Sequence, residues 1–415
     1  LFEESDQPHE ELPVLFRILP KAMAADTFAE LDTDAQQALI SAFSDRELRE
    51  VISDMFADDA ADLVEEMPAN VVRRILKNVD PDVRRDINAL LNCPEDSAGS
   101  IMTTEFVSLK TMMTVQQAFA RIRQTGVDKE TIYTCYVVAP GGKLLGLVSV
   151  KDLLLADYDD IIGSIMNQNV ISCNTLEDQE EVARMFTRYD FSALPVVDNE
   201  NRLVGIVTVD DAIDVLEEEA TEDIEKMAAI TPSDKPYLKT GIFETYKSRI
   251  PWLLILMISA TFTGMIIRHF EEALAAYVVL TTFIPMLMDS GGNSGGQASV
   301  TVIRSLSLGD IGFSDMPRIV WKELRVALLC GVTLAAANFA KLMLFDRVGV
   351  AVSAVVCLTL LATVFIAKLV GCTLPLLAKK VGFDPAVMAR PFITTIVDAI
   401  ALIIYFQIAH LILGI

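Results

Sequence analysis

The chain has 415 residues, enough for two to four domains, and a formal net charge of −23. Residues 1–240 hold 47 acidic against 21 basic residues, whereas residues 241–415 hold 10 against 13. Such an acidic N-terminal half argues against nucleic acid as a partner, because phosphate backbones attract basic surfaces. The six cysteines form no C-x-x-C pair and the three histidines are scattered, which excludes a disulfide framework and a zinc site.

Residues 15–92 read as a series of short amphipathic helices separated by acidic residues or proline. Examples are "DRELREVISDMF", "PANVVRRILKNV" and "PDVRRDINALL". Each segment carries one narrow apolar stripe and cannot bury it alone, so the helices are expected to stack as a superhelix. We therefore predict an acidic α-helical N domain over residues 1–96.

A duplicated unit follows. "GSIM" begins at Gly99 and again at Gly163, and "KLLGLVSVKDLL" (143–154) aligns with "RLVGIVTVDDAI" (202–213). Each copy has two apolar strands and a helix that opens with Asp, a pattern typical of a small α/β sandwich. The pair resembles tandem CBS domains, which we place at residues 97–160 and 161–216.

Both copies contain an S/T-x-x-D motif where the second strand meets its helix. In CBS domains this position often holds the ribose and phosphate of adenosyl ligands. The same spacing is also a helix capping box, which explains the motif locally. Capping and binding of an adenine nucleotide such as ATP both remain open, and the candidate residues are Ser149, Asp152, Thr208 and Asp211.

Residues 209–227 predict a strongly acidic helix. Asp211, Asp214, Glu218 and Glu222 recur at helical spacing and share one face, where like charges repel. A solvated surface is the ordinary interpretation of such a run. A second acidic group at Asp58, Asp59 and Asp62 favours a cation sensor, in which carboxylates on two surfaces close around Mg²⁺.

Residues 217–248 are expected to form the rest of this acidic connecting helix and an amphipathic helix before the membrane. The stretch from Tyr237 to Tyr246 could transmit movement from the N-terminal domains, or it could be a passive linker.

The remainder, residues 249–415, contains five apolar runs long enough to cross a bilayer. They are Pro251 to Ile267, Leu274 to Ile303, Glu323 to Phe345, Val350 to Ala378 and Pro391 to Leu413. Basic residues gather in alternate connections, so the positive-inside rule places the N-terminal domains in the cytosol and the C-terminus outside. We expect a multi-pass protein of the plasma (inner) membrane.

The second apolar run is interrupted by "DSGGNSGGQ" (289–297). Glycine at this density permits close helix packing, or it lines a water-filled cavity. Asp289, Asn293 and Gln297 recur every four residues, which favours an aqueous path and makes Asn293 and Gln297 candidates for lining a pore.

The fifth run carries a single carboxylate, Asp398, in "RPFITTIVDAIALIIYF". Charged groups inside membranes are costly and mark ion or proton paths. Three interpretations are open: a structural ion pair with Lys368, a proton relay, and a cation site, which we favour. Two copies related by a two-fold axis would present two charges to a hydrated divalent cation, with Thr394 and Thr395 beside them.

The domain order, together with "TVDDAIDVLEEEATEDI" (208–224), "GGNSGGQ" (291–297) and "VDAIALIIYF" (397–406), resembles the MgtE family of magnesium channels along essentially the whole chain. The resemblance implies a homodimeric Mg²⁺ channel whose second and fifth spans line the pore, with Asp398 as its central ion-binding residue. It also implies regulatory Mg²⁺ at or near Asp58, Asp62, Asp211, Asp214, Glu219, Glu222 and Asp223. Gly296 and Arg390 stand where the family carries or can carry Asn, so the cytosolic lining of the pore differs.

These observations predict a non-enzymatic, multi-domain membrane protein that admits Mg²⁺ into the cytosol and is shut by Mg²⁺ bound to its acidic N-terminal module. Two alternatives remain: a cation-coupled secondary transporter of divalent cations, and a membrane receptor that senses a nucleotide through its CBS pair.

Overall fold

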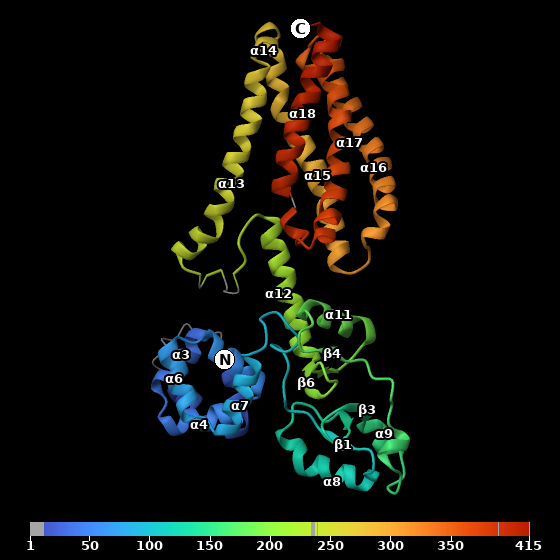
Figure 1. Cartoon of the computed structure of the whole chain (residues 1–415). Helices are drawn as coiled ribbons and strands as arrows, with labels where there is room; N and C mark the ends of the chain where they lie inside the picture. Colours follow the sequence, from blue (N-terminus) through green and yellow to red (C-terminus); the bar gives the residue numbers. More distant parts are fainter. Residues whose placement is uncertain (1–11, 234–236, 239, 389, 415) are drawn as a thin grey trace. The chain divides into compact units, whose positions relative to one another are not determined.

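The structure is a computed structural model of the chain, and it describes residues 12–233, 237–238, 240–388 and 390–414. Its internal contacts divide the chain into two units, Leu1–Glu217 and Glu218–Ile415. Each unit is described by itself, and Figure 1 shows the elements of both.

The first unit begins with seven short helices, as the sequence predicts. Local caps start several of them: Asp32 accepts from the Ala35 amide, and Ser44 and Glu47 form a capping box. Phe16, Phe28 and Phe43 form an aromatic cluster at the centre of their core. The helices are α1 (Leu12–Phe16), α2 (Lys21–Ala29), α3 (Thr33–Ala42), α4 (Asp45–Asp54), α5 (Ala57–Glu66), α6 (Ala69–Asn78) and α7 (Pro81–Leu90).

Two three-stranded sheets of the same topology follow and bear out the tandem CBS prediction. In each sheet the first strand is parallel to the second, which is antiparallel to the third. The strands are β1 (Ser108–Lys110), β2 (Thr134–Val138), β3 (Leu144–Ser149), β4 (Cys173–Asn174), β5 (Ala193–Val197) and β6 (Leu203–Thr208). The accompanying helices are α8 (Val115–Thr125), η1 (Gly126–Asp128), α9 (Val150–Leu155), α10 (Ile162–Ile165) and α11 (Gln179–Tyr189).

The two sheets share a core, and the N-terminal helices join it. Tyr136 of β2 and Ile206 of β6 are fully buried in one cluster between the repeats. Ala61 of α5 and Leu90 of α7 pack in a second cluster with Phe186 of the second CBS repeat. This packing brings α5, with its acidic residues, to the CBS pair.

Helix α12 (Val209–Met227) leaves the last strand and runs into the second unit. Residues from Ile242 onward form the first turns of one long helix, α13, and not a separate helix. The second unit contains α13 (Ile242–His269), α14 (Glu271–Ala276), η2 (Val278–Phe283), α15 (Ile284–Ser307), η3 (Phe313–Asp315), α16 (Met316–Lys341), η4 (Leu342–Asp346), α17 (Val350–Val381), η5 (Ala386–Met388) and α18 (Arg390–Leu413).

Four segments in the described residues are long and apolar enough to cross a membrane: 242–269, 313–346, 350–381 and 386–413. The second expected span corresponds to α15, which has 24 residues but is more polar. Four spans are therefore supported by length and composition, and the fifth stays a prediction.

Helices α15, α16, α17 and α18 pack together, and α13 lies against α18 (Figure 1). One small-residue stripe on α15 makes this packing close. A Cβ added to Gly291 would meet Thr363 of α17, and one added to Gly295 would lie 3.0 Å from the Ala367 carbonyl oxygen. Helix α17 approaches the same stripe with Gly371, where an added Cβ would overlap the carbonyl oxygen of Gly295. Backbones that approach this closely are typical of helix pairs within membranes.

We predict that Gly371→Ala destabilises the membrane unit, because the new methyl group would press on backbone that cannot move aside. Overpacking of this kind costs about 1–3 kcal/mol. Thermal unfolding of the detergent-solubilised protein measures the effect. Gly264→Ala is the matched control, since a Cβ at Gly264 of α13 meets nothing within 4 Å. Equal stability of the two variants would contradict the close packing of α15 on α17.

Candidate ion path and cation sites

Asp398 lies in the first half of α18, and its carboxylate is not neutralised by the lysine that the sequence suggested. Its Oδ1 atom is buried and has no hydrogen-bond partner among the residues that the structure describes. Lys368 of α17 pairs instead with Glu323 of α16, at 3.4 Å from Nζ to Oε2, and the two side chains are 6% and 14% exposed. The ion pair between Asp398 and Lys368, one of the three interpretations that the sequence left open, is therefore not formed among the described residues.

Helix α15 lies directly against the segment of α18 that carries Asp398. Gly292 faces the Thr394 methyl group, and Gly291 faces Val397. Thr394 and Thr395 both donate their hydroxyl protons to the Pro391 carbonyl oxygen, at 2.9 and 3.2 Å. Their oxygen lone pairs remain the groups that could accept from ordered water or contact a cation.

The polar residues of α15 lie on a different face from its glycine stripe. Asp289 and Gln297 are exposed, and Asn293 is half-buried. Asp289 also repels Asp398 electrostatically, so two carboxylates act in the same region of the helix pair. The sequence had placed Asp289 on this polar face without assigning it to the ion site. The side chain of Arg390, a predicted pore-lining residue, lies outside the described residues.

The three aspartates of α5 lie within electrostatic range of Asp211. Burial, with repulsion from Asp211 and Asp59, raises the pKa of Asp58 to about 8. Burial and repulsion from Asp211 raise the pKa of Asp59 to about 6. Burial also raises the pKa of Asp211 itself, against the hydrogen bond from Thr208. This group is called the α5 acidic cluster below.

Glu130, which the sequence analysis missed, belongs to the α5 acidic cluster. Burial and repulsion from Asp211 and Asp210 raise its pKa to about 7. Glu130 follows the short helix η1, and no motif marks it in the sequence. Only the fold brings it to residues that are about 70 to 80 positions away in the chain.

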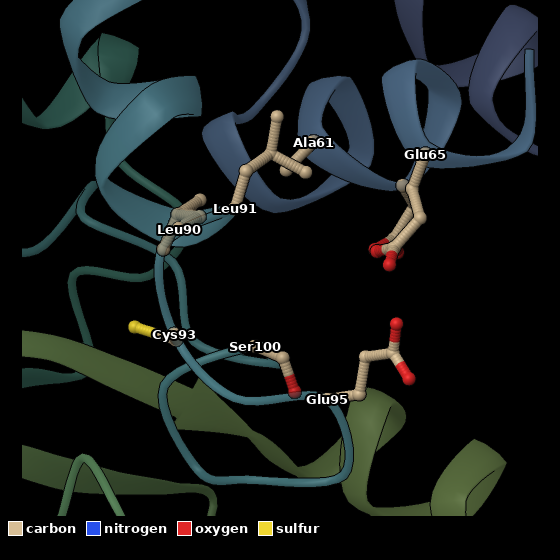
Figure 2. A pocket seen from close by; sticks show the side chains of 8 residues that line it. Ala61, Glu65, Leu90, Leu91, Cys93, Glu95 and Ser100 are labelled. Atoms are coloured by element: carbon tan, nitrogen blue, oxygen red, sulfur yellow. The ribbon is translucent and has the colours of Figure 1, made fainter.

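Asp62 lies at the edge of the α5 acidic cluster and lines a cavity of about 300 Å³. Figure 2 shows Glu65 and Glu95 on opposite sides of this cavity, with their carboxylates directed toward one another. Leu90 and Leu91 form part of its apolar wall. The cavity thus presents three carboxylates on a partly apolar surface.

The other predicted regulatory carboxylates separate along α12. Asp214 and Glu218 are exposed, whereas Glu219, Glu222 and Asp223 are half-buried. Asp223 accepts a hydrogen bond from Ser307, at the end of α15. Among the residues that the structure describes, no three Asp, Glu, His or Cys side chains are grouped closely enough to hold a metal ion. Mg²⁺ that keeps several waters does not require so tight a group.

Both S/T-x-x-D motifs cap helices. The Ser149 hydroxyl donates to Asp152 at 2.5 Å, and the Asp152 amide donates back to the Ser149 hydroxyl at 3.1 Å. The Thr208 hydroxyl likewise donates to the Asp211 carboxylate. Capping is therefore confirmed, and nucleotide binding by the same residues stays a proposal.

Three family models match the chain. One described as a divalent cation transporter matches residues 284–408, an MgtE intracellular N domain matches residues 1–96, and CBS domains match residues 98–159 and 162–218. The magnesium transporter MgtE of Thermus thermophilus is 39% identical over 96% of this chain and 89% of its own length. The chain belongs to the MgtE family.

Further relatives agree with the family assignment. The magnesium transporter MgtE of Bacillus subtilis is 35% identical over 92% of this chain and 84% of its own length. A crystal structure of the cytosolic domain of the Mg²⁺ channel MgtE in complex with ATP is 40% identical, with a TM-score of 0.49, and covers 51% of this chain and 86% of that chain. A crystal structure of the soluble part of a magnesium transporter shares 32% sequence identity, with a TM-score of 0.43. It covers 51% of this chain and 93% of that chain.

The protein is therefore a multi-domain membrane protein of a magnesium transporter family, with a cytosolic N-terminal domain and a CBS pair. This family assignment supports the predicted class of transporter over that of enzyme.

We predict that Glu323→Gln destabilises the membrane unit by about 3–5 kcal/mol, because it leaves the buried Lys368 ammonium without its partner. The double variant Glu323→Gln/Lys368→Met should recover most of the loss. Thermal unfolding in detergent measures both variants, with Glu272→Gln on the exposed surface of α14 as the control. A single variant as stable as the unchanged protein would argue against a desolvated ion pair.

We also predict that the stability of the α5 acidic cluster falls as pH rises. A carboxyl group whose pKa is raised on folding stabilises the fold below its unfolded value, near 3.9, and loses this contribution as pH rises through the folded value, about 8 for Asp58. The melting temperature should therefore fall from about pH 5.5 to about pH 9, and fall less in Asp58→Asn, by about 2–4 °C for each kcal/mol retained.

Asp34→Asn, on the exposed surface of α3, is the control for this pH series and should follow the unchanged protein. Added Mg²⁺ at the higher pH should raise the melting temperature of the unchanged protein more than that of Asp58→Asn, because it binds the charged carboxylates. Identical pH profiles for Asp58→Asn and Asp34→Asn would show that the cluster is not coupled to folding.

Proposed function

We propose that the protein is a homodimeric channel that passes Mg²⁺ down its electrochemical gradient into the cytosol. The observation that carries this proposal is Asp398, whose buried Oδ1 atom has no partner while Lys368 is occupied by Glu323. A carboxylate at membrane depth requires a compensating charge or water. The exposed polar face of α15 supplies an adjacent surface that is poorly suited to lipid.

In this proposal, two copies of the chain meet at a two-fold axis, and Asp398 from each copy faces the shared path. Two carboxylates attract one divalent cation without removing its water shell, which Mg²⁺ gives up reluctantly. The C-terminus faces outward, so the path leads from outside to the cytosolic domains. Asp289 adds negative charge near Asp398 and strengthens the attraction.

The α5 acidic cluster is proposed to close this path when cytosolic Mg²⁺ is high. Asp211, Asp59 and Glu130 exert the largest charge effects on Asp58, and all three are negative. Mg²⁺ that binds between α5 and α12 removes their repulsion and favours a compact cytosolic module. Several weak sites can together supply the about 5.5 kcal/mol that shifts a two-state equilibrium from 1:99 to 99:1.

ATP is proposed as a ligand of the CBS pair. This rests on the 40% identity to the cytosolic domain of an Mg²⁺ channel crystallised with ATP. Ser149, Asp152, Thr208 and Asp211 are the candidate contacts. Asp211 would then contribute both to nucleotide binding and to the α5 acidic cluster, so ATP and Mg²⁺ would influence each other's affinity.

We predict that Asp398→Ala and Asp398→Asn abolish Mg²⁺ uptake into vesicles, because the path loses its charge, while the protein stays folded. Uptake is measured with an Mg²⁺-sensitive dye inside the vesicles, and folding by thermal unfolding. Asp310→Asn, at an exposed position after α15, is the control and should retain uptake. Normal flux through Asp398→Asn would refute the pore assignment.

The gate is tested in the same vesicles by varying Mg²⁺ on each face separately. Millimolar Mg²⁺ on the cytosolic face should reduce flux, and Asp58→Asn should need more Mg²⁺ for the same reduction. Unitary currents in a planar bilayer distinguish a channel from a cation-coupled carrier, which produces none. ATP added to the cytosolic face should shift the Mg²⁺ concentration at which flux falls.

A further inference from the structure

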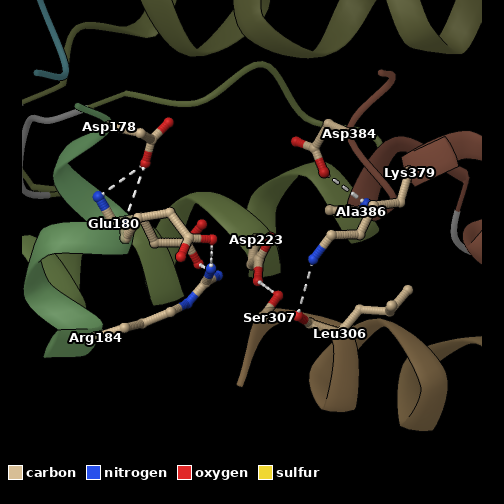
Figure 3. A network of polar contacts seen from close by, with 10 residues as sticks. Asp178, Glu180, Arg184, Asp223, Leu306, Ser307, Lys379, Asp384 and Ala386 are labelled. Carbon is tan, nitrogen blue, oxygen red and sulfur yellow. Dashed lines mark hydrogen bonds and ion pairs between the residues drawn. The ribbon is translucent and has the colours of Figure 1, made fainter. Parts of the chain in front are cut away.

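The C-terminal part of α12 contacts the ends of two membrane helices, within residues 218–415. Met227 packs with Ile303 of α15 and Ala386 of η5. The Ser307 hydroxyl, at the last residue of α15, donates to Asp223 Oδ2 at 2.8 Å (Figure 3). These two contacts give α12 both an apolar and a polar attachment to the membrane unit.

A third contact is an ion pair through Lys226. Its Nζ atom lies 2.6 Å from Glu222 Oε1 and 2.7 Å from Asp384 Oδ2. The side chain is 22% exposed, so water screens it only in part. A lysine ammonium group is charged at physiological pH, and here it lies between two carboxylates.

Asp384 is itself fixed by the turn in which it lies. Its Oδ1 atom accepts from the Ala386 amide at 2.7 Å (Figure 3). Asp384 lies in the connection between α17 and α18, and this bond leaves its Oδ2 atom directed to Lys226. Beside it, Lys379 at the end of α17 donates to the Leu306 carbonyl oxygen of α15 at 3.3 Å. Lys226 thus attaches α12 to the turn that leads into α18, the helix of Asp398.

Removing the lysine would leave like charges together. Asp384 and Glu222 both repel Asp223, whereas Lys226 attracts it. An exposed ion pair contributes little to stability because water screens it. Lys226 differs because it is mostly buried, bridges two carboxylates and offsets the repulsion on a third.

We propose that Lys226 is a positioning residue for transport: its ammonium group bridges Glu222 and Asp384 and so holds α12 against the turn before α18, while Asp223 holds the end of α15. The bridging cation belongs to the chain, so this attachment does not depend on Mg²⁺. The role of α15 and α18 as pore helices rests on the proposed function above. The attachment itself can be measured without any transport.

Hydrogen–deuterium exchange of the full-length protein in nanodiscs tests this proposal, with EDTA present so that no divalent cation replaces the ammonium. Lys226→Gln should speed exchange in the peptide containing Asp384 and Ala386, and in the peptide ending α12, by at least about tenfold, the ratio expected for loss of a hydrogen bond to a charged group. Lys226→Arg should keep the slow exchange.

The exchanged pair Lys226→Asp/Asp384→Lys should recover slower exchange than either single variant, which a merely local loss of packing would not produce. Lys110→Gln, at an exposed position on β1, is the control and should match the unchanged protein. Unaltered exchange in Lys226→Gln, or no recovery in the exchanged pair, would overturn the proposal. Asp398→Ala should keep the slow exchange. The exchange experiment therefore tests the role of Lys226 even if Asp398 is not a pore residue.

Discussion

An ionised carboxylate within hydrocarbon is the constraint on which the membrane unit depends. Transfer of such a group costs at least about 2.5–3.5 kcal/mol, so it must meet a counter-charge or water. Lys368 on the neighbouring helix α17 could have supplied that counter-charge, but it forms an ion pair with Glu323. Lys368 therefore does not neutralise Asp398, which is why the proposed function assigns a mobile cation to this carboxylate.

The glycine-rich segment of α15 makes this arrangement possible. Gly291, Gly295 and Ser299 recur on one face, and the absence of large side chains there lets α17 and α18 approach the backbone. Another face of the same helix is polar, and Asp289 and Gln297 are exposed there. One short sequence thus explains both the close packing and the hydrophilic surface beside Asp398, so the two interpretations of this segment are compatible.

The sequence predicted those features that depend on local pattern. The repeated strand–turn–strand segments predicted the two sheets, the S/T-x-x-D motif at Ser149 marked the start of a helix, and the apolar run around Asp398 predicted the last helix. In the structure, the charge of Asp211 also acts on Asp58, and both residues were candidates for the predicted cation sensor. These features can be read locally because neighbouring residues determine them.

Long-range pairings could not be read in this way. The sequence analysis offered Asp398 as a possible partner for Lys368, and the packing of α16 on α17 selects Glu323 instead. Glu130 carries no local signal, because it reaches the α5 acidic cluster through the fold of the first CBS repeat. In the sequence, nothing distinguishes Lys226 from other lysines at the end of an acidic helix. Its partner is found only in the fold, where Asp384 Oδ2 lies 2.7 Å from Lys226 Nζ. Charge partners distant in sequence are set by topology, which composition does not encode.

The two ends of the α12 region differ in how their negative charge is neutralised, and this difference indicates where Mg²⁺ dependence should arise. Near the membrane helices, Lys226 supplies a permanent positive charge between Glu222 and Asp384. Near α5, the largest charge effects on Asp58 come from other carboxylates, and a proton or a cation from solution would offset their repulsion. A cation from solution can change the energy of the second arrangement far more than that of the first. In the proposed function, the responsive element is therefore the region where α5 faces the start of α12, while the proposed attachment at Lys226 keeps the far end of the same helix against α15 and the turn before α18.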